Sequence, residues 1–492
     1  MFLILFVFLT SLFAIYHFYW SRRHLPPGPL PYPLIGNVNL MTNKLRPGYA
    51  LWKDLKEKYG PVFTFWEGSM PLIMVTDWEI IKETFIKDGG NYAERPTVPM
   101  NVELRSGLYG ILEATGSLWQ SQRRFALHVL RNFGLGKNLM EDRVLTEVRA
   151  MVEQVKNGGK VQDLQTNFDA AVGSIINTML FGYRYDETNI QEFISLKESL
   201  NAHFSARSNA FGVLLFMYPW LGYLPYFSGL RKIFHTNMGN LQILFQKQIN
   251  EKKKTMNYDN EDYSDYVEAY LKEMKKHEHE PDQGGFTSIQ LLNVCLDLWI
   301  AGMETTSNTL YWSVLYVALN PEVKKKVYEE LDAVIGSDRL ITMSDKTELN
   351  YVNATINEVQ RLANLIPING PHVTGDTVTI GGYTVPKGTV TVPMISLVMY
   401  DENIFPEPEK FDPTRFLDAS GKLKKVEELC PFSIGKRQCL GEGLAKMELF
   451  LFFSNVFNQF RIDLHDKNPS TDKDYGITMR AESYKLNVEK RF

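Results

Sequence analysis

The sequence is poor in cysteine and has no excess of charge of either sign. Its three cysteines, Cys295, Cys430 and Cys439, are too few for a disulfide framework in 492 residues, so we expect the folded part in a reducing compartment. The 53 basic and 57 acidic residues give a net charge of −4. Because a nucleic-acid-binding protein needs a basic excess, we expect no nucleic-acid partner.

The chain also lacks internal repeats and a glycine-rich dinucleotide fingerprint. Its glycine-rich segments lie on predicted hairpins or in the loop around Gly435, which is the wrong context for a flavin or nicotinamide site. Electrons for any redox reaction must therefore come from another protein. With 44% hydrophobic and 13% aromatic residues, the chain has ample material for a large core.

Lysine, arginine, aspartate and glutamate are absent from the first 20 residues. An apolar helix of this length, at about 1.5 Å per residue, can cross a bilayer. Arg22 and Arg23 follow directly, which places the N-terminus outside and the rest in the cytoplasm. A cleaved signal peptide is the alternative, but neither a basic n-region nor a small-residue cleavage site is evident. We divide the chain into a membrane anchor (1–21), a basic and proline-rich hinge that acts as a stiff spacer (22–34), and one folded domain (35–492).

Hydrophobic patterns predict both strands and helices in the folded domain. Segments 62–66 and 72–75 predict an early hairpin, and 381–389 predicts a second hairpin that completes a small sheet. Segment 288–320 has no proline before its end and predicts one long helix through the protein. The aromatic-rich segment 211–234 contains two prolines, and it is either a core helix pair or a lid over a pocket.

One cysteine stands in a setting that suits a metal ligand. Cys439 lies between Gly435 and Gly441, just before an apolar helix that begins near Glu442. Backbone N–H groups of such a turn and the positive end of the helix favour a thiolate. Zinc needs further ligands, and no Cys or His follows nearby, so one sulfur suggests a metal held by a macrocycle. Arg437 could pair with a carboxylate of that macrocycle. A lone cysteine is more often a buried hydrophobe, which is our interpretation of Cys295 and Cys430.

Residues Phe432, Gly435, Arg437, Cys439 and Gly441 match the FxxGxRxCxG pattern, and the loop resembles the haem loop of the cytochrome P-450 superfamily of haem-thiolate monooxygenases. Further motifs of the superfamily appear in the expected order along the chain. They are WxxxR at Trp119 and Arg123, AGxET at 301–305, ExxR at Glu358 and Arg361, Pro371-His372, and FxPxRF at 411–416 with Arg415.

The resemblance implies a mostly α fold with a small β region, a triangular helical prism around haem b, preceded by an N-terminal transmembrane helix. The domain at 35–492 would be the haem-thiolate catalytic domain of a microsomal family-2-like member. Cys439 would ligate the iron. Phe432, Gly435 and Gly441 would shape the haem loop, and the haem propionates would be bound by Arg437, Trp119, Arg123, His372 and Arg95.

The same resemblance assigns roles within the long helix and to a buried triad. Thr305 would hydrogen-bond to dioxygen, and Glu304 would help to deliver protons. Gly302 would let a ligand approach the helix, and the Thr305 hydroxyl could turn onto a helix carbonyl and loosen the turn. Glu358 and Arg361 would ordinarily be a surface ion pair, but the resemblance implies a buried triad with Arg415 that supports folding and haem retention.

The function implied is insertion of one oxygen atom of O2 into an apolar small molecule, such as a xenobiotic, a fatty acid or a steroid-like compound. An NADPH-dependent flavoprotein reductase, with cytochrome b5 as a further donor, would supply electrons at the endoplasmic reticulum membrane. It would dock on a basic face that includes Arg124, Arg131, Lys436 and Lys446. Two alternatives stay open: a haem-thiolate isomerase or dehydratase that needs no reductase, and a non-catalytic haem gas sensor. We expect the loops at 97–115, 211–227, 365–369 and 477–479 to choose the substrate.

Overall fold

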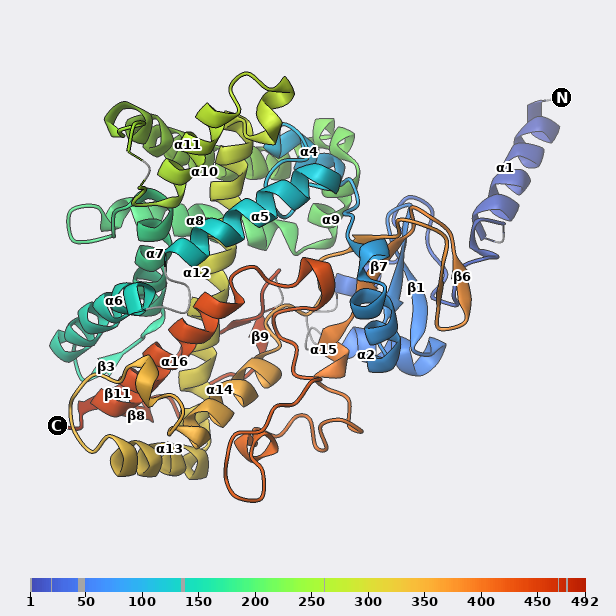
Figure 1. Cartoon of the computed structure of the whole chain (residues 1–492). Helices are drawn as coiled ribbons and strands as arrows, with labels where there is room; N and C mark the ends of the chain where they lie inside the picture. Colours follow the sequence, from blue (N-terminus) through green and yellow to red (C-terminus); the bar gives the residue numbers. More distant parts are fainter. Residues whose placement is uncertain are drawn as a thin grey trace.

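One long helix, α12 (Ser288–Leu319), runs through the middle of the molecule, as predicted for 288–320 (Figure 1). The side chain of Thr287 caps its first turn by accepting a hydrogen bond from the backbone N–H of Gln290, and Pro321 begins the next helix. Most side chains of α12 are buried, including Asp297 and Glu304. A helix buried on all sides needs partners for its polar groups, and these partners shape the site described below.

The computed structural model describes residues 2–18, 20–42, 49–133, 138–260, 262–467, 469–474 and 477–492. The other α-helices are α1 (Phe2–Phe18), α2 (Ala50–Tyr59), α3 (Trp78–Ile81), α4 (Pro99–Arg105), α5 (Gly116–Asn132), α6 (Asn138–Asn157), α7 (Gln165–Phe181), α8 (Ile190–Arg207), α9 (Ala210–Met217), α10 (Pro225–Thr255), α11 (Tyr266–Lys276), α13 (Pro321–Val334), α14 (Asn350–Ala363), α15 (Ile395–Val398) and α16 (Glu442–Gln459). The short helices are η1 (Trp20–Arg22), η2 (Val38–Thr42), the π-helix η3 (Lys82–Lys87), η4 (Gly89–Tyr92), η5 (Pro219–Tyr223), η6 (Pro281–Gly285), η7 (Met343–Asp345), η8 (Pro413–Phe416) and η9 (Gly435–Arg437).

The strands form small separate sheets. They are β1 (Val62–Glu67), β2 (Met70–Val75), β3 (Val161–Gln162), β4 (His372–Val373), β5 (Val378–Ile380), β6 (Tyr383–Val385), β7 (Val390–Pro393), β8 (Phe460–Leu464), β9 (Lys473–Asp474), β10 (Arg480–Ala481) and β11 (Leu486–Lys490). The sheet orders are β1-β2-β7-β4, β3-β11-β8, β5-β6 and β10-β9. The mostly α fold with a small β region is the architecture expected from the resemblance.

The β1-β2 hairpin forms as predicted, with Phe65 opposite Leu72. The prediction for 381–389 was wrong in one respect. The hairpin there, β5-β6, is a sheet of its own, and β7 completes the larger sheet by running parallel to β2. Alternation of side chains marks a strand but not its partner, and a parallel partner far along the chain leaves no local signal.

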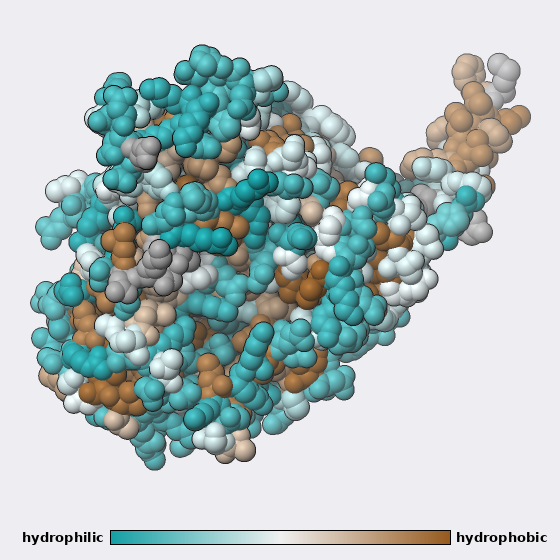
Figure 2. Space-filling view, in the orientation of Figure 1, coloured by the Kyte–Doolittle hydropathy of each residue, from teal (hydrophilic) through white to brown (hydrophobic). Residues whose placement is uncertain are grey.

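Helix α1 projects from the body of the molecule, and its side chains are mostly apolar and exposed (Figures 1 and 2). It covers 17 residues, while residues 1 and 19 of the predicted anchor lie outside the described residues. Within the described ranges, the one helix long and apolar enough to cross a membrane is 281–319, and 61% of its apolar window is buried in the core. The apolar helix at the N-terminus, Ile4–His17, is shorter than a membrane-spanning helix needs to be. The membrane anchor therefore stays a prediction.

The proline-rich hinge is bound to the folded domain over part of its length. The Thr64 backbone N–H donates to the Pro27 carbonyl at 2.8 Å, and the Thr64 hydroxyl donates to the Pro26 carbonyl at 2.7 Å. A Cβ on Gly28 would lie 2.0 Å from the Thr64 carbonyl oxygen, so the close approach requires glycine. The segment from Pro26 to Gly28 is therefore packed on β1, and it is not the spacer that we expected.

Glu358, Arg361 and Arg415 meet where α14 contacts η8. The Glu358 and Arg361 side chains are fully buried, with Arg361 donating from Nε and Nη2 at 2.7 and 2.8 Å. Arg415 Nε lies 3.3 Å from Glu358 Oε1, and the backbone N–H of Asp412 donates to the same oxygen at 2.9 Å. The carboxylate thus joins two segments that are 54 residues apart. This triad is the arrangement expected from ExxR, rather than a surface ion pair.

Replacing Arg361 by methionine should lower the free energy of unfolding by roughly 3–5 kcal/mol, because the Glu358 charge would remain buried without its main partner. The measurement is urea unfolding followed by circular dichroism. Lys325→Met is the matched control, since Lys325 and Glu329 form an exposed pair at 3.8 Å. That control should cost less than about 1 kcal/mol. Equal costs for the two variants would contradict a structural role of the triad.

Candidate functional site

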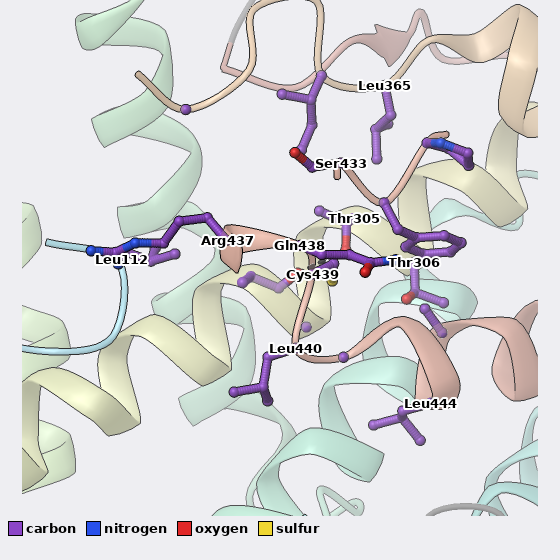
Figure 3. Close-up of a pocket in the computed structure, with 18 of the residues that line it drawn as sticks. Leu112, Thr305, Thr306, Leu365, Ser433, Arg437, Gln438, Cys439, Leu440 and Leu444 are labelled. Atoms are coloured by element: carbon purple, nitrogen blue, oxygen red, sulfur yellow. Dashed lines mark hydrogen bonds between the residues drawn. The ribbon is translucent and has the colours of Figure 1, made fainter. Parts of the chain in front are cut away.

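A cavity of about 320 Å³ lies between α12, the loop before α16 and the first half of α16. Cys439 and Leu440 line it from the loop, and Thr305 and Thr306 line it from α12 (Figure 3). The cavity wall is mainly apolar, with guanidinium groups that come from α5, the loop and the segment before α4. The sequence motifs at 119–123, 301–305 and 432–441 therefore meet at one cavity although they are far apart in the chain.

The loop presents the Cys439 side chain to the cavity. Gly435 has a φ of +70°, and a Cβ there would lie 2.0 Å from the Phe85 carbonyl oxygen, so this turn requires glycine. Burial raises the pKa of the Cys439 thiol, while hydrogen bonds from the backbone of Gly441 and Glu442 and the charge of Arg123 lower it. Burial prevails. The predicted thiolate is thus favoured by its turn, but it needs a bound cation to be the stable form.

Hydrogen-bond donors gather at one end of the cavity. Arg437 donates to the carbonyls of Ala93, Ile111 and Ala114 at 2.7, 3.1 and 2.7 Å, and its guanidinium carbon lies 3.9 Å from the centroid of the Trp119 ring. Within the described residues, the buried Nε1 of Trp119 has no hydrogen-bond acceptor. Arg123 donates to the Gln438 carbonyl at 2.6 Å.

Arg95 and His372 lie at the same end of the cavity. Burial lowers the pKa of Arg95 to about 10, so its charge is kept at neutral pH. The His372 Nδ1 donates to the Tyr92 carbonyl at 2.5 Å. Burial, followed by the charge of Arg95, lowers the pKa of His372 to about 3, so the ring is neutral and its Nε2 is an acceptor. His372 is thus in the expected place, and a carboxylate beside the ring would favour its protonated form, in which Nε2 becomes a donor.

Thr305 has the geometry predicted from the AGxET sequence. Its hydroxyl donates to the Ala301 carbonyl at 2.7 Å, which is the bond that loosens a helix turn. Gly302 lines the cavity, where it leaves room for a ligand beside the helix. A Cβ there would also lie 2.6 Å from Ile176 Cδ1 on α7, so the glycine makes room for the packing of α7 against α12 as well.

Glu304, to which the resemblance assigns a role in delivering protons, has its side chain turned away from the cavity. It is 1% exposed, and among the described residues it is absent from the cavity wall. Its carboxylate instead binds Lys197 of α8 and Arg480 of β10 on the other side of α12. Burial alone would raise the pKa of Glu304, but Lys197 and Arg480 outweigh it and hold the pKa below its ordinary value. The spacing that places Thr305 at the cavity turns its neighbour away by about 100° around the helix.

Sequence analysis missed Lys197, Arg480 and Glu448. The sequence neighbours of Lys197 and Arg480 are polar and give no signal, because only folding brings these two residues to α12. Glu448 carries a signal that could have been noticed, because it is a lone acid within the apolar run of α16. It lines the cavity, and burial raises its pKa to about 8.

Two of the four loops expected to choose the substrate line the cavity. Ile111 and Leu112 come from 97–115, and Leu365, Ile366 and Asn369 come from 365–369. As far as the structure describes the chain, no residue of 211–227 or 477–479 lines it. Segment 211–227 forms α9, η5 and the start of α10, with exposed Trp220, Tyr223 and Tyr226.

Comparisons with known proteins agree with these motifs. The family model described as Cytochrome P450 matches residues 26–488. Cytochrome P450 2C28 of Mesocricetus auratus is 35% identical over 481 residues, covering 96% of this chain and 94% of the relative. Cytochrome P450 2U1 of Bos taurus is 33% identical, covering 96% and 90%. Cytochrome P450 2C5 of Oryctolagus cuniculus is 37% identical, covering 90% and 88%.

The cavity fits a haem group by its own chemistry. A flat apolar macrocycle suits the apolar walls between α12 and α16. Its two carboxylates suit the end where three guanidinium groups and the orphaned indole N–H of Trp119 gather. An iron at the centre of such a macrocycle suits the Cys439 sulfur, which lies within the protein but is accessible from the cavity.

If Cys439 is the axial ligand, Cys439→Ser should abolish the thiolate signature in the absorption of the reduced carbon monoxide complex. Oxygen ligation would not supply the electron density of a thiolate. Cys430→Ala is the matched control, because the Cys430 thiol is buried nearby and donates to the Glu428 carbonyl at 3.4 Å. That variant should keep the wild-type spectrum. A spectrum unchanged in Cys439→Ser but lost in Cys430→Ala would overturn the assignment.

Proposed function

Because the chain belongs to the cytochrome P450 family, we propose that it is a haem-thiolate monooxygenase with Cys439 as the axial ligand. Family membership makes it an enzyme that binds haem through a cysteine thiolate. The finer proposal is that it inserts one atom of O2 into an apolar small molecule with electrons from NADPH. The observation that carries it is the cavity that Cys439 and Thr305 line from opposite elements.

When bound, haem supplies the iron at which dioxygen is activated and which makes the oxidation possible. The protein contributes position and protons. Arg437, Arg123 and the Trp119 N–H would fix the carboxylates of the macrocycle, since these donors meet at one end of the cavity. The Thr305 hydroxyl, now bonded to the Ala301 carbonyl, can rotate about χ1 to face the cavity and offer a proton there.

The substrate that these walls favour is apolar. Leu112, Leu298, Ala301, Leu365 and Ile366 line the cavity. Asp297 also lines it, but its carboxylate accepts hydrogen bonds from the backbone of Ile111 and Leu112 at 2.7 and 2.9 Å and pairs with Arg105 at 2.7 Å. With this charge neutralised, the walls offer mainly dispersion and hydrophobic contact, as a xenobiotic, fatty acid or steroid-like molecule requires.

Membrane attachment supports a substrate that partitions into lipid. The exposed apolar α1 would be the anchor, and Arg23, whose guanidinium lies 3.4 Å from the centroid of the Trp20 ring, would lie at the membrane interface. Exposed Trp220, Tyr223 and Tyr226 form a second apolar surface between α9 and α10. We place the protein at the endoplasmic reticulum with its folded domain in the cytoplasm, where a flavoprotein reductase and cytochrome b5 could reach it.

The proposed docking surface is a hollow on the side of α5 that faces the loop. Arg124, Arg131 and Lys436 line it, together with Trp119 and Arg123 of the cavity. Lys446, which we also expected there, pairs with Glu442 at 2.7 Å and lies outside the hollow as the structure describes it. A negatively charged partner at this surface would lie close to the end of the cavity where the donors gather.

Oxygen incorporation should require both O2 and NADPH. Purified holoprotein, reductase and NADPH would be incubated with a lipid extract under ¹⁸O2, and mass spectrometry should find products heavier by one labelled oxygen atom. The same incubation without NADPH is the control. Product formation without NADPH or reductase would favour the isomerase or dehydratase, and ligand binding without any product would favour the gas sensor.

Charge reversal in the hollow should slow electron transfer from the reductase. Lys436→Glu and Arg131→Glu should each reduce the rate about tenfold at low ionic strength, with a weaker effect at high salt. Stopped-flow spectroscopy of reduction under carbon monoxide measures the rate. Lys387→Glu is the control, because Lys387 is exposed and lies on the turn after β6. Unchanged reduction kinetics in both hollow variants would exclude this docking surface.

A further inference from the structure

One face of α12 leads from the cavity to a group of buried tyrosines. Thr305 and Thr309 line the cavity from this helix. Trp312 and Tyr316 follow at intervals of three and four residues, so they lie on the same face beyond the cavity wall. Their rings stack with 5.0 Å between centroids, and the Trp312 indole N–H donates to the Met479 carbonyl at 2.9 Å. A pair of oxidisable aromatic side chains thus begins where the cavity ends.

Tyr400 and Tyr49 continue this group of aromatic side chains toward the surface. Tyr400 follows Met399, which lines the cavity. The rings of Tyr400 and Tyr49 stack with 3.9 Å between centroids and 24° between planes, closer than the range of about 4.5–7 Å that aromatic pairs prefer. Burial raises the pKa of Tyr400 above its ordinary value, and Tyr316 and Tyr49 raise it further. The three tyrosines are therefore close enough to interact electrostatically.

The paired charges of Glu358 and Arg361 lie beside these rings. The Arg361 guanidinium carbon is 5.7 Å from the centroid of the Tyr400 ring. A lone cation at that distance would oppose the removal of an electron from the ring. Arg361 is not a lone cation, because the Glu358 carboxylate lies 2.7 Å from its Nε. The surroundings of Tyr400 thus carry little net charge, and they permit oxidation of the ring.

Tyr49 has a partner that can accept its proton. Its hydroxyl donates a hydrogen bond to the carboxylate of Glu409, which is exposed. Burial, followed by this hydrogen bond, raises the pKa of Tyr49 above its ordinary value, so the phenol keeps its proton at neutral pH. The Tyr400 hydroxyl donates instead to the Leu362 carbonyl at 2.6 Å, and a carbonyl does not take up the proton. Since a phenol loses its proton when it loses an electron, Tyr49 is better placed than Tyr400 to stay oxidised.

We propose that an aromatic path carries one-electron oxidation from the cavity to Tyr49. The path consists of Trp312, Tyr316, Tyr400 and Tyr49. The inference goes beyond the proposed function and needs only that haem occupies the cavity. The oxidant is haem that a peroxide has oxidised while no substrate is bound. Tyr49 loses one electron, which passes along the aromatic rings to the haem, and one proton, which passes to Glu409. A neutral tyrosyl radical and a carboxylic acid result, and the oxidation leaves the cavity without attack on the residues that line it.

The test treats the haem-loaded full chain with an organic hydroperoxide in the absence of substrate and reductase. Electron paramagnetic resonance of rapidly frozen samples should show a tyrosyl radical, and ring-deuterated tyrosine should narrow its signal. Tyr49→Phe keeps the stacked ring but removes the phenol proton, so this variant should lose the signal. Glu409→Gln keeps a hydrogen-bond acceptor but removes the base, and we expect the same loss.

A third variant and two controls locate the path. Trp312→Phe replaces the first oxidisable ring beyond the cavity and should also lose the signal. Tyr270→Phe changes a buried tyrosine that donates to Gln122 at 3.0 Å, away from the path. Glu407→Gln changes an exposed acid that pairs with Lys410 at 3.5 Å. Both controls should keep the wild-type signal. The absorption of the reduced carbon monoxide complex checks that every variant binds haem alike.

A second readout is the survival of the haem during the reaction with the hydroperoxide. Bleaching of the haem should be faster in Tyr49→Phe and Glu409→Gln than in the wild type, because the oxidation then stays in the cavity. An unchanged tyrosyl signal in Tyr49→Phe would overturn the proposal. So would the absence of a protein radical in a wild type whose haem reacts with the hydroperoxide.

The outcome for the aromatic path is distinguishable from that for the proposed function. Loss of the radical in the three path variants, with the yield of ¹⁸O-labelled product unchanged, would support both. A radical that depends on Tyr49, in a protein that forms no oxygenated product, would support the path and contradict the proposed function. Labelled product without a radical in the wild type would contradict the path alone.

Discussion

A charge buried in this protein must have a partner, and that requirement determines how the cavity walls are held. The cost of an unpaired buried charge is several kcal/mol, which is comparable to the whole stability of a domain. Three acids of the interior, Asp297, Glu304 and Glu358, each bind a cation from a distant segment, namely Arg105, Lys197 and Arg415. Asp297 joins α12 to the 110–112 loop, and Glu358 joins α14 to η8. Each ion pair therefore fixes the two segments that it joins relative to each other.

At the end of the cavity the buried charges are positive, because they belong to guanidinium groups. Arg437 is satisfied by three backbone carbonyls, which carry no net charge, and burial lowers its pKa to about 9. These acceptors are neutral, and the charges of Glu94 and Glu113 offset the lowering of the Arg437 pKa only in part, so a dianionic ligand would be favoured at this end. The same end holds His372 in its neutral form. A haem that brought two carboxylates would relieve the mutual repulsion of Arg95 and Arg437.

The sequence sufficed for those features that depend on a short stretch of chain. The run from 288 to 320 predicted α12, and the alternation at 62–75 predicted the first hairpin. The glycine pattern around Cys439 predicted a loop that presents a thiol, and the resemblance brought the separate motifs to one site. Pairings across the fold left no such signal. The parallel contact of β2 with β7, the docking of Pro26 on Thr64 and the contact of Gly302 with Ile176 all depend on segments that meet only after folding.

Glu304 shows why a sequence motif predicts the chemistry of a residue better than the direction in which its side chain points. Adjacent residues on an α-helix point about 100° apart, so the position of Thr305 at the cavity does not place Glu304 there as well; Thr306, on the other side of Thr305, lines the cavity instead. Thr305 is small and can lie at the surface of the cavity, while a carboxylate there would face apolar walls without a cation. Lys197 and Arg480 offer two cations on the other side of the helix, at 2.7 Å for Lys197. Electrostatics thus decides where the Glu304 carboxylate lies, because both cations that bind it lie away from the cavity.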